Sequence, residues 1–357
     1  MPGQTYRFDQ SFEWNYVNGP DFAGPFPDVP ATPLKMFLGL PVRSRLGIPA
    51  SILSTSRWVE TYAHLGFDIL TFKTVRSMAR LCGSAPNWLH LDDAELGRQL
   101  NDPEAPLHVV DRPSVLSGLT LAGSFGMPSA PPSLWQPDLE RACHSIGEGQ
   151  LLIGSIVGTA GDTVSDTAFI ADFDRLARQV CEAGVDAVEA NLSCPNVGRA
   201  EGELYRDIER SGQIARTVRG ASQGRPVLLK TGPFEDIASL RAFLHAVNGH
   251  ADAIVMINAP SRRIVRADGT PAFPPGRERA GVIGKRILPI ALETVRTARQ
   301  IIDDDRLRLE IVGVGGLTDP ADARAFLDAG ACAAQSATGA MFNPHLAVET
   351  KRADPDL

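Results

Sequence analysis

The chain has 357 residues, of which 43% are hydrophobic and 22% are charged, and its formal net charge is -7. This length and composition suit an ordinary globular protein with one large α/β domain or two smaller ones. The acidic balance argues against a protein that mainly holds nucleic acid, because neutralising phosphates requires a basic surface. No apolar run is long enough to cross a bilayer, and the amino terminus lacks a signal-peptide pattern, so we expect no membrane role.

The cysteine pattern points to free thiols. The five cysteines are widely spaced, and no two of them form a CxxC pair. The sequence therefore predicts neither a zinc ribbon nor an iron–sulfur cluster, and we expect no metal site. Free thiols fit a reducing compartment, so the expected location is the cytoplasm.

The chain divides into an amino-terminal arm and a barrel-like remainder. Residues 1–46 are rich in proline, glycine and aromatic side chains without a clear period, which predicts an arm packed on the main domain. From residue 47 to 357, short apolar runs alternate with helical patterns, as in βα units. Eight strands are predicted, at Pro49–Leu53, Phe67–Lys73, Leu151–Val157, Val185–Leu192, Pro226–Lys230, Ala253–Asn258, Leu309–Val314 and Cys332–Ser336. Eight units favour an α/β fold of the TIM-barrel, (β/α)₈, type over an open doubly wound sheet, whose GxGxxG motif is absent.

Three helices between these strands have clear signals. Apolar residues recur at helical spacing over 172–181 and again over 237–247. A third helix has Asp319 as its predicted N-cap, Pro320 at its first position and Gly330 after its end.

Two segments exceed the minimal barrel. Residues 82–120 form a polar, proline-containing stretch, and residues 259–285 form another that is notably cationic. Both lie between predicted strands of the barrel. We therefore expect both to be long loops over the carboxyl-terminal mouth, where such barrels carry their active sites.

Polar residues gather where the predicted strands end. Carboxyl ends of barrel strands converge on one site, so these residues should meet at the mouth. They are Ser51, Lys73, Thr74, Asn191, Ser193, Cys194, Lys230, Asn258, Gly315, Gly316, Gln335, Ser336, Ala337 and Thr338. Gly315 and Gly316 with Ala337 and Thr338 follow the seventh and eighth strands, the recurrent phosphate site of these barrels.

The segment 191–196, Asn-Leu-Ser-Cys-Pro-Asn, is the most informative motif. It follows an apolar strand, and Pro195 ends that strand because it has no N–H. A lone cysteine is usually structural, and spacing alone leaves the structural and the catalytic interpretation of Cys194 open. Its position among the other strand-end residues favours the catalytic interpretation.

These motifs resemble those of the dihydroorotate dehydrogenase family, in particular the class 1 members with a cysteine base. The chain is also similar to the FMN- and pyrimidine-binding part of dihydropyrimidine dehydrogenase. The similarity runs from Gly47 to Asn343 and includes the cysteine motif, Phe72-Lys73-Thr74, Leu229-Lys230, Ile257-Asn258 and the two terminal loops.

The resemblance implies an FMN-dependent oxidoreductase acting on a CH–CH bond next to a carbonyl, with Cys194 exchanging the proton. Lys73 and Ser193 would assist catalysis. The residues implied to hold FMN are Ala50, Ser51, Lys73, Asn191, Lys230, Gly281, Gly315, Gly316, Ala337 and Thr338. The implied substrate is a small cyclic amide, bound by Asn191, Ser193, Asn196 and Asn258. A homodimer is also implied, whereas the electron acceptor or donor stays open.

The substrate side departs from the family pattern. Gly123 and Ser129 stand where orotate-binding members carry asparagines, and Ala259 replaces a serine or threonine. Residues 84–88, Ser-Ala-Pro-Asn-Trp, replace a Gly-Asn-Pro-x-Pro-Arg segment. Each change removes hydrogen bonds that the original substrate would need, so another cyclic amide or a secondary metabolite is an alternative substrate.

Three other functions fit parts of this pattern. A dihydrouridine synthase acting on tRNA also pairs a barrel with a cysteine acid, but the acidic charge opposes it. A flavin-free barrel would use Lys73 or Lys230 as a Schiff-base amine. A catalytically inactive binding subunit would not need Cys194 and both lysines.

Overall fold

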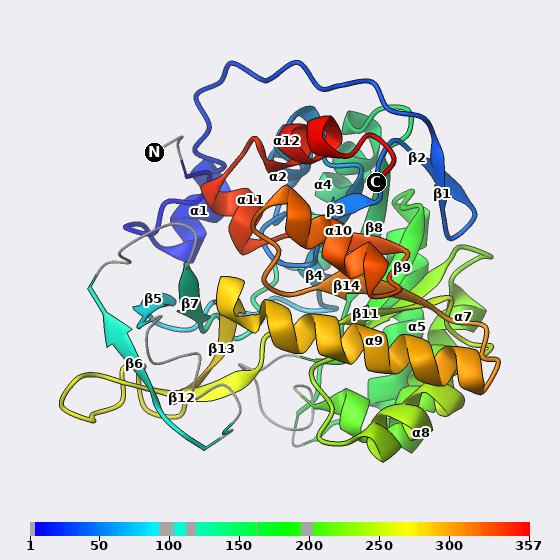
Figure 1. Cartoon of the computed structure of the whole chain (residues 1–357). Coiled ribbons are helices and arrows are strands. Elements are labelled where there is room, and N and C mark those ends of the chain that lie inside the picture. Colours follow the sequence, from blue (N-terminus) through cyan, green and yellow to red (C-terminus); the bar gives the residue numbers. More distant parts are fainter. Residues whose placement is uncertain (1–3, 93–101, 103, 112–118, 162, 194–202) are drawn as a thin grey trace.

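The computed structural model describes residues 4–92, 102, 104–111, 119–161, 163–193 and 203–357. Its centre is a closed barrel in which β10, β11, β14, β15, β3, β4, β8 and β9 are neighbours in that order (Figure 1). Every neighbouring pair is parallel. The bounds are β3 Leu46–Ile48, β4 Ile69–Val75, β8 Leu151–Ile156, β9 Ala187–Asn191, β10 Val227–Lys230, β11 Ala253–Met256, β14 Glu310–Val314 and β15 Ala333–Gln335. The predicted (β/α)₈ barrel is confirmed.

The first strand lies earlier than the sequence predicted. The strand expected at Pro49–Leu53 is instead Leu46–Ile48, and the predicted residues form the loop after it. Pro49 has no N–H to give to a strand ladder, and its carbonyl accepts a hydrogen bond from Ser51 Oγ at 3.0 Å. This shift puts Ser51 at the barrel mouth, in the loop that follows the strand.

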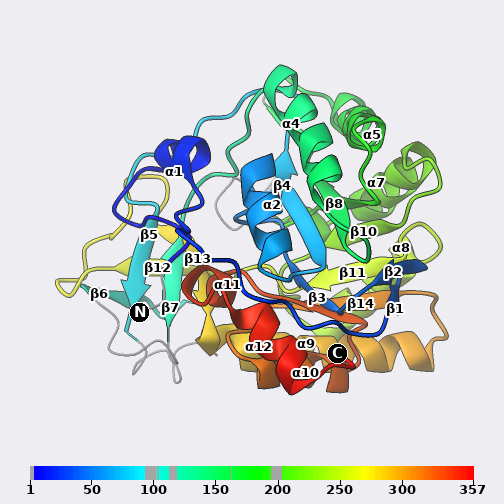
Figure 2. The same cartoon turned by 90° about the horizontal axis from the view of Figure 1, so that it is seen from above.

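Helices surround the barrel (Figure 2). They are α2 Ser56–His64, α4 Pro132–Ser145, α5 Asp166–Glu182, α7 Ile208–Ala221, α8 Ile237–Val247, α9 Leu288–Asp304, α10 Pro320–Asp328, α11 Thr338–Phe342 and α12 Leu346–Ala353. The predicted helices correspond to α5, α8 and α10. Asp319 caps α10 by accepting the Asp322 N–H at 3.1 Å, and Gly330 follows the helix with a φ of 99°. Within the described ranges, no helix is both long and apolar enough to cross a membrane.

The two extra segments form a second, smaller barrel beside the first (Figure 2). Its neighbours in order are β12, β13, β7, β5 and β6. Their bounds are β5 Trp88–Leu91, β6 Leu107–Val110, β7 Thr120–Gly123, β12 Ser261–Val265 and β13 Arg279–Gly284. The expected long loops over the mouth therefore contain strands that the sequence did not predict. Residues such as Leu91, Leu107, Ala122 and Ile264 give the small barrel an apolar core of its own.

The amino-terminal segment reaches both ends of the main barrel (Figure 2). Helix α1, Phe12–Asn18, lies near the small barrel, whereas the hairpin of β1, Lys35–Phe37, and β2, Leu40–Val42, lies at the opposite end. Phe37 and Val42 are fully buried against barrel residues such as Ile69 and Leu228. The hairpin therefore closes the amino-terminal end of the barrel and leaves the other end for a site.

Candidate active site at the barrel mouth

Strand-end side chains are buried at the carboxyl end of the barrel. Asn191 ends β9 and is 4% exposed, and Lys230 ends β10 and is 3% exposed. Lys73 and Thr74 lie on β4, and Gln335 ends β15. Burying such groups is costly unless they have partners, so their concentration here indicates a site rather than a core.

A directed chain of hydrogen bonds runs beneath this mouth. Asn191 Nδ2 donates to Thr74 Oγ1 at 3.0 Å, and the Thr74 hydroxyl lies 3.0 Å from Ser155 Oγ. Ser155 donates to Glu189 Oε1 at 2.8 Å. Because Ser155 gives its proton to the carboxylate, Thr74 donates to Ser155 and Asn191 donates to Thr74. The carboxyl group thus fixes the orientation of the Asn191 amide.

Glu189 is the buried acid of this network. Burial raises the pKa of its carboxyl group, and the positive charge of Lys230 acts in the opposite direction. Its second oxygen, Oε2, has no hydrogen-bond partner among the described residues. Glu189 and Lys230 thus give the floor of the mouth one positive and one negative group.

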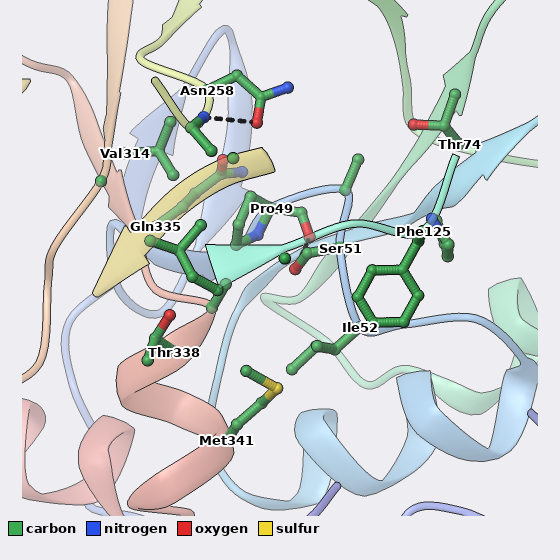
Figure 3. Close-up of a pocket in the computed structure, with 18 of the residues that line it drawn as sticks. Pro49, Ser51, Ile52, Thr74, Phe125, Asn258, Val314, Gln335, Thr338 and Met341 are labelled. Atoms are coloured by element: carbon green, nitrogen blue, oxygen red, sulfur yellow. Dashed lines mark hydrogen bonds between the residues drawn. The ribbon is translucent and has the colours of Figure 1, made fainter. Parts of the chain in front are cut away.

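Two asparagine side chains form hydrogen bonds with the backbone of Ser193. Asn191 Oδ1 accepts the Ser193 N–H at 3.2 Å, and the Ser193 carbonyl accepts a hydrogen bond from Asn258 Nδ2. Asn258 Oδ1 also accepts the Ala259 N–H at 2.9 Å, as Figure 3 shows. These bonds set the direction of both amides.

Two loops at the ends of the last strands bring backbone N–H groups together. Gly315 and Gly316 have φ angles of 121° and 86°, which favour glycine. A Cβ at Gly316 would lie 2.5 Å from the Leu288 nitrogen. Within the described part of the chain, the N–H groups of Gly316, Ala337 and Thr338 find no acceptor. These donors suit an anion or a polar ring edge.

One cavity collects the predicted site residues (Figure 3). Those that line it are Ala50, Ser51, Lys73, Asn191, Ser193, Lys230, Asn258, Gly281, Gly315, Gly316, Ala337 and Thr338. Gly281 reaches it from the small barrel, where it pairs with Gly123. Cys194, which directly follows Ser193 in the sequence, and Asn196 lie outside the described residues.

Comparisons with known proteins identify the family. The sequence model of the family described as "Dihydroorotate dehydrogenase" matches residues 139–352. A Dictyostelium discoideum protein named dihydroorotate dehydrogenase is 34% identical over 96% of this chain and 95% of its own. The chain belongs to the dihydroorotate dehydrogenase family.

More distant relatives extend the comparison. The catalytic subunit of a dihydroorotate dehydrogenase B (NAD(+)) from Thermoanaerobacter is 30% identical over 55% of this chain and 61% of its own. A solved dihydroorotate dehydrogenase from Eimeria tenella, in complex with ferulenol, superposes with a TM-score of 0.69 over 92% of this chain and 85% of that chain. Its 16% identity supports the fold alone.

The dihydroorotate dehydrogenase family is FMN-dependent and acts on a CH–CH bond. The cavity fits such a flavin. Gln335 Oε1 is buried without a hydrogen-bond partner among the described residues, which suits a ring N–H of a flavin. The N–H groups of Gly316, Ala337 and Thr338, which find no acceptor among the described residues, suit flavin oxygens or the phosphate.

Sequence reasoning missed the residues that cover the cavity from outside the main barrel. Tyr6, Phe12, Asn15 and Tyr16 come from the amino-terminal segment, and Trp88 comes from β5. One sequence pattern could have predicted part of the group from the amino-terminal segment. Ser11 is an N-cap that accepts the Trp14 N–H at 3.1 Å, and Phe12 and Tyr16 then lie one helical turn apart.

Proposed function

We propose that this dihydroorotate dehydrogenase family member oxidises or reduces the CH–CH bond next to the carbonyl of a small cyclic amide of the dihydropyrimidine class. The observation that carries the proposal is the pair of asparagines, Asn191 and Asn258, joined through Ser193 at one side of the cavity.

The two amides retain bonding capacity that suits a ring amide. Each side-chain amide has two N–H donors and two acceptor lone pairs. Asn258 uses one donor on Ser193 and one lone pair on the Ala259 N–H. Asn191 Nδ2 donates one hydrogen bond to Thr74. The same nitrogen lies 3.8 Å from the Met127 sulfur, which is a weak acceptor. A ring amide or imide offers the complementary N–H and C=O groups.

Cys194 is proposed as the acid/base. It follows Ser193, whose N–H and C=O are both held by the asparagines. A thiolate there takes the acidic proton next to the substrate carbonyl, and a thiol returns it in the reverse direction. When bound, FMN accepts or donates the hydride at its N5.

The two lysines have different proposed tasks. Lys230, above the buried Glu189, supplies positive charge where negative charge grows as the cofactor is reduced. Lys73 lines the cavity and a neighbouring side cavity, which suits a contact to both cofactor and substrate.

The test is anaerobic mixing of the FMN-loaded protein with dihydroorotate, dihydrouracil and dihydrothymine, observed as loss of the visible flavin absorbance. We expect at least one compound to bleach the flavin, and Cys194→Ser to slow that bleaching by about 10²–10⁴-fold. Cys143→Ser is the matched control, because Cys143 lies on α4 and lines neither the cavity nor its side cavity. Burial raises the pKa of Cys143 to about 12, so this thiol stays protonated at neutral pH and its loss should leave the rate unchanged.

Two results would contradict the proposal. A Cys194→Ser protein that is reduced as fast as the unchanged protein would remove the cysteine from the mechanism. A protein that binds FMN but is bleached by none of the three compounds would remove the proposed substrate class.

The family resemblance also supports proposals on the oligomeric state, the location and the electron partner. We infer a homodimer in the cytoplasm that acts in pyrimidine metabolism and passes electrons to or from a separate partner. Light scattering on the FMN-loaded protein tests the dimer. Reoxidation of the reduced protein by fumarate, a quinone or oxygen identifies the class of acceptor.

A further inference from the structure

An aromatic cover closes the side of the cavity that faces the small barrel. It consists of Tyr6, Phe12, Tyr16, Trp88 and Phe125, all of which line the cavity. The rings of Trp88 and Phe125 meet edge to face at 4.8 Å, and Phe125 meets Phe12 at 5.9 Å. Tyr6 meets Trp88 at 6.1 Å. These contacts join the amino-terminal segment to β5 and to the loop after β7, so the cover is a packed unit.

Trp88 occupies the space that a side chain at position 123 would need. Trp88 and Gly123 are directly opposite each other in the antiparallel pair of β5 and β7. A Cβ on Gly123 would lie 2.9 Å from Trp88 Cζ3 and 3.3 Å from Trp88 Cε3. The indole therefore replaces the polar group that an asparagine at position 123 would present, and glycine is the residue that leaves room for it.

The aromatic cover contains no charged group. Among the described lining residues the charged side chains are Lys73 and Lys230, and both come from main-barrel strands. A carboxylate placed against the cover would lose its water without gaining a cation from the cover itself. An apolar ring placed there would gain contact with several aromatic faces.

A side cavity shares part of its lining with the aromatic cover. Phe12, Tyr16 and Lys73 line both cavities. The rest of the side cavity combines apolar residues such as Phe72 and Trp135 with two charged residues, Glu13 and Arg80. The space next to the cover therefore accepts an apolar group larger than a methyl.

We propose that the substrate carries an apolar, planar substituent, such as an aryl group, where dihydroorotate carries its carboxylate. This inference rests on the proposed function and narrows it. The asparagine pair binds the ring amide, and the aromatic cover binds the substituent.

The test compares three dihydrouracils that carry hydrogen, a carboxylate or a phenyl group on the same ring carbon. Each is mixed anaerobically with the FMN-loaded protein, and kcat/KM or the single-turnover equivalent is measured from flavin bleaching. We expect the phenyl compound to exceed the carboxylate compound by about tenfold or more, because a buried phenyl group removes a large apolar area from water.

Two variants link the preference to the cover. Trp88→Ala should lower the phenyl-to-carboxylate ratio by about tenfold, because the ring loses its main aromatic partner. The double variant Trp88→Ala, Gly123→Asn, which restores a polar group in the vacated space, should lower the ratio further. Trp14→Ala is the matched control, because Trp14 lies on the same helix as Phe12 but outside the cavity lining. Unchanged FMN content and melting temperature show that each variant is folded.

The outcomes separate this inference from the proposed function. Faster bleaching by the carboxylate compound, or a ratio that Trp88→Ala leaves unchanged, would overturn the inference while flavin reduction still upholds the proposed function. Bleaching by none of the three compounds would overturn both.

Discussion

The two ends of the main barrel use the same eight strands for different purposes. At the amino-terminal end, Ile69, Leu151 and Leu228 pack against Phe37 and Val42 of the hairpin. At the other end of the barrel, the carboxyl ends of the strands carry polar residues that surround the mouth. These residues are Lys73, Thr74, Asn191, Lys230 and Gln335. The interior thus changes from apolar to polar along each strand, so that one end contributes stability and the other contributes the site.

Buried charges differ between the two ends as well. At the closed end, Asp68 Oδ2 lies 2.7 Å from Lys351 Nζ, and both side chains are 1% exposed. Ser44 donates to the same carboxylate at 2.5 Å. At the mouth, Glu189 Oε2 and Gln335 Oε1 have no hydrogen-bond partner among the described residues. The closed end pairs its charges internally, whereas the mouth holds acceptors for something that binds there.

The largest effect on stability is expected from Lys351→Met at the closed end. Removing the ammonium leaves Asp68 buried opposite an apolar chain, which costs about 3–5 kcal/mol of unfolding free energy. Burial already raises the pKa of Asp68, with Lys351 opposing that shift, so the carboxyl group loses its main charge partner. Urea unfolding measures the change. An unfolding free energy equal to that of the unchanged protein would show that the ion pair is not structural.

Lys230→Met makes the same chemical change at the mouth and should act on chemistry instead. We expect flavin reduction to slow by about 10²–10³-fold, because a positive group near the developing charge is lost. The cost in stability should be smaller than for Lys351→Met, because FMN and solvent remain near the mouth. Stopped-flow absorbance and urea unfolding of both variants separate the two effects. Equal rates of flavin reduction in Lys230→Met and Lys351→Met would contradict the assignment of stability to one end of the barrel and chemistry to the other.

The smallest effect is expected from Gln335→Leu. This change removes a buried acceptor, Oε1, that has no hydrogen-bond partner among the described residues. The apoprotein loses only the 3.3 Å hydrogen bond from Gln335 Nε2 to Thr71 Oγ1, so its stability should fall by about 1 kcal/mol. FMN binding should weaken by about 1–3 kcal/mol, because the cofactor loses a buried partner. Fluorescence titration of apoprotein with FMN measures the affinity. An unchanged affinity would place the flavin ring away from Gln335.

The main barrel could be predicted because its signal is local. Each strand is a short apolar run followed by a helical pattern, and strand ends converge by geometry, so Lys73, Asn191, Lys230 and Asn258 could be grouped without a structure. The first strand was misplaced because Ile52 and Leu53 are as apolar as Leu46 and Ile48, and only the Pro49 turn separates the two sets.

The small barrel and the aromatic cover could not be predicted in the same way. Strands β5, β6 and β7 have four residues each, too few for a clear alternation. The partnership of Trp88 with Gly123 depends on the register between β5 and β7, which no local pattern encodes. Phe12 and Tyr16 reach the cavity only because the amino-terminal segment folds back over the mouth.

Hydrogen–deuterium exchange with and without FMN tests the contrast between the two ends most directly. We predict that FMN protects the segments around Gly315–Gly316 and Ala337–Thr338, and leaves the hairpin at residues 35–42 unchanged. Protection that is absent from the mouth, or that is centred on the hairpin, would contradict the assignment of the mouth as the flavin site.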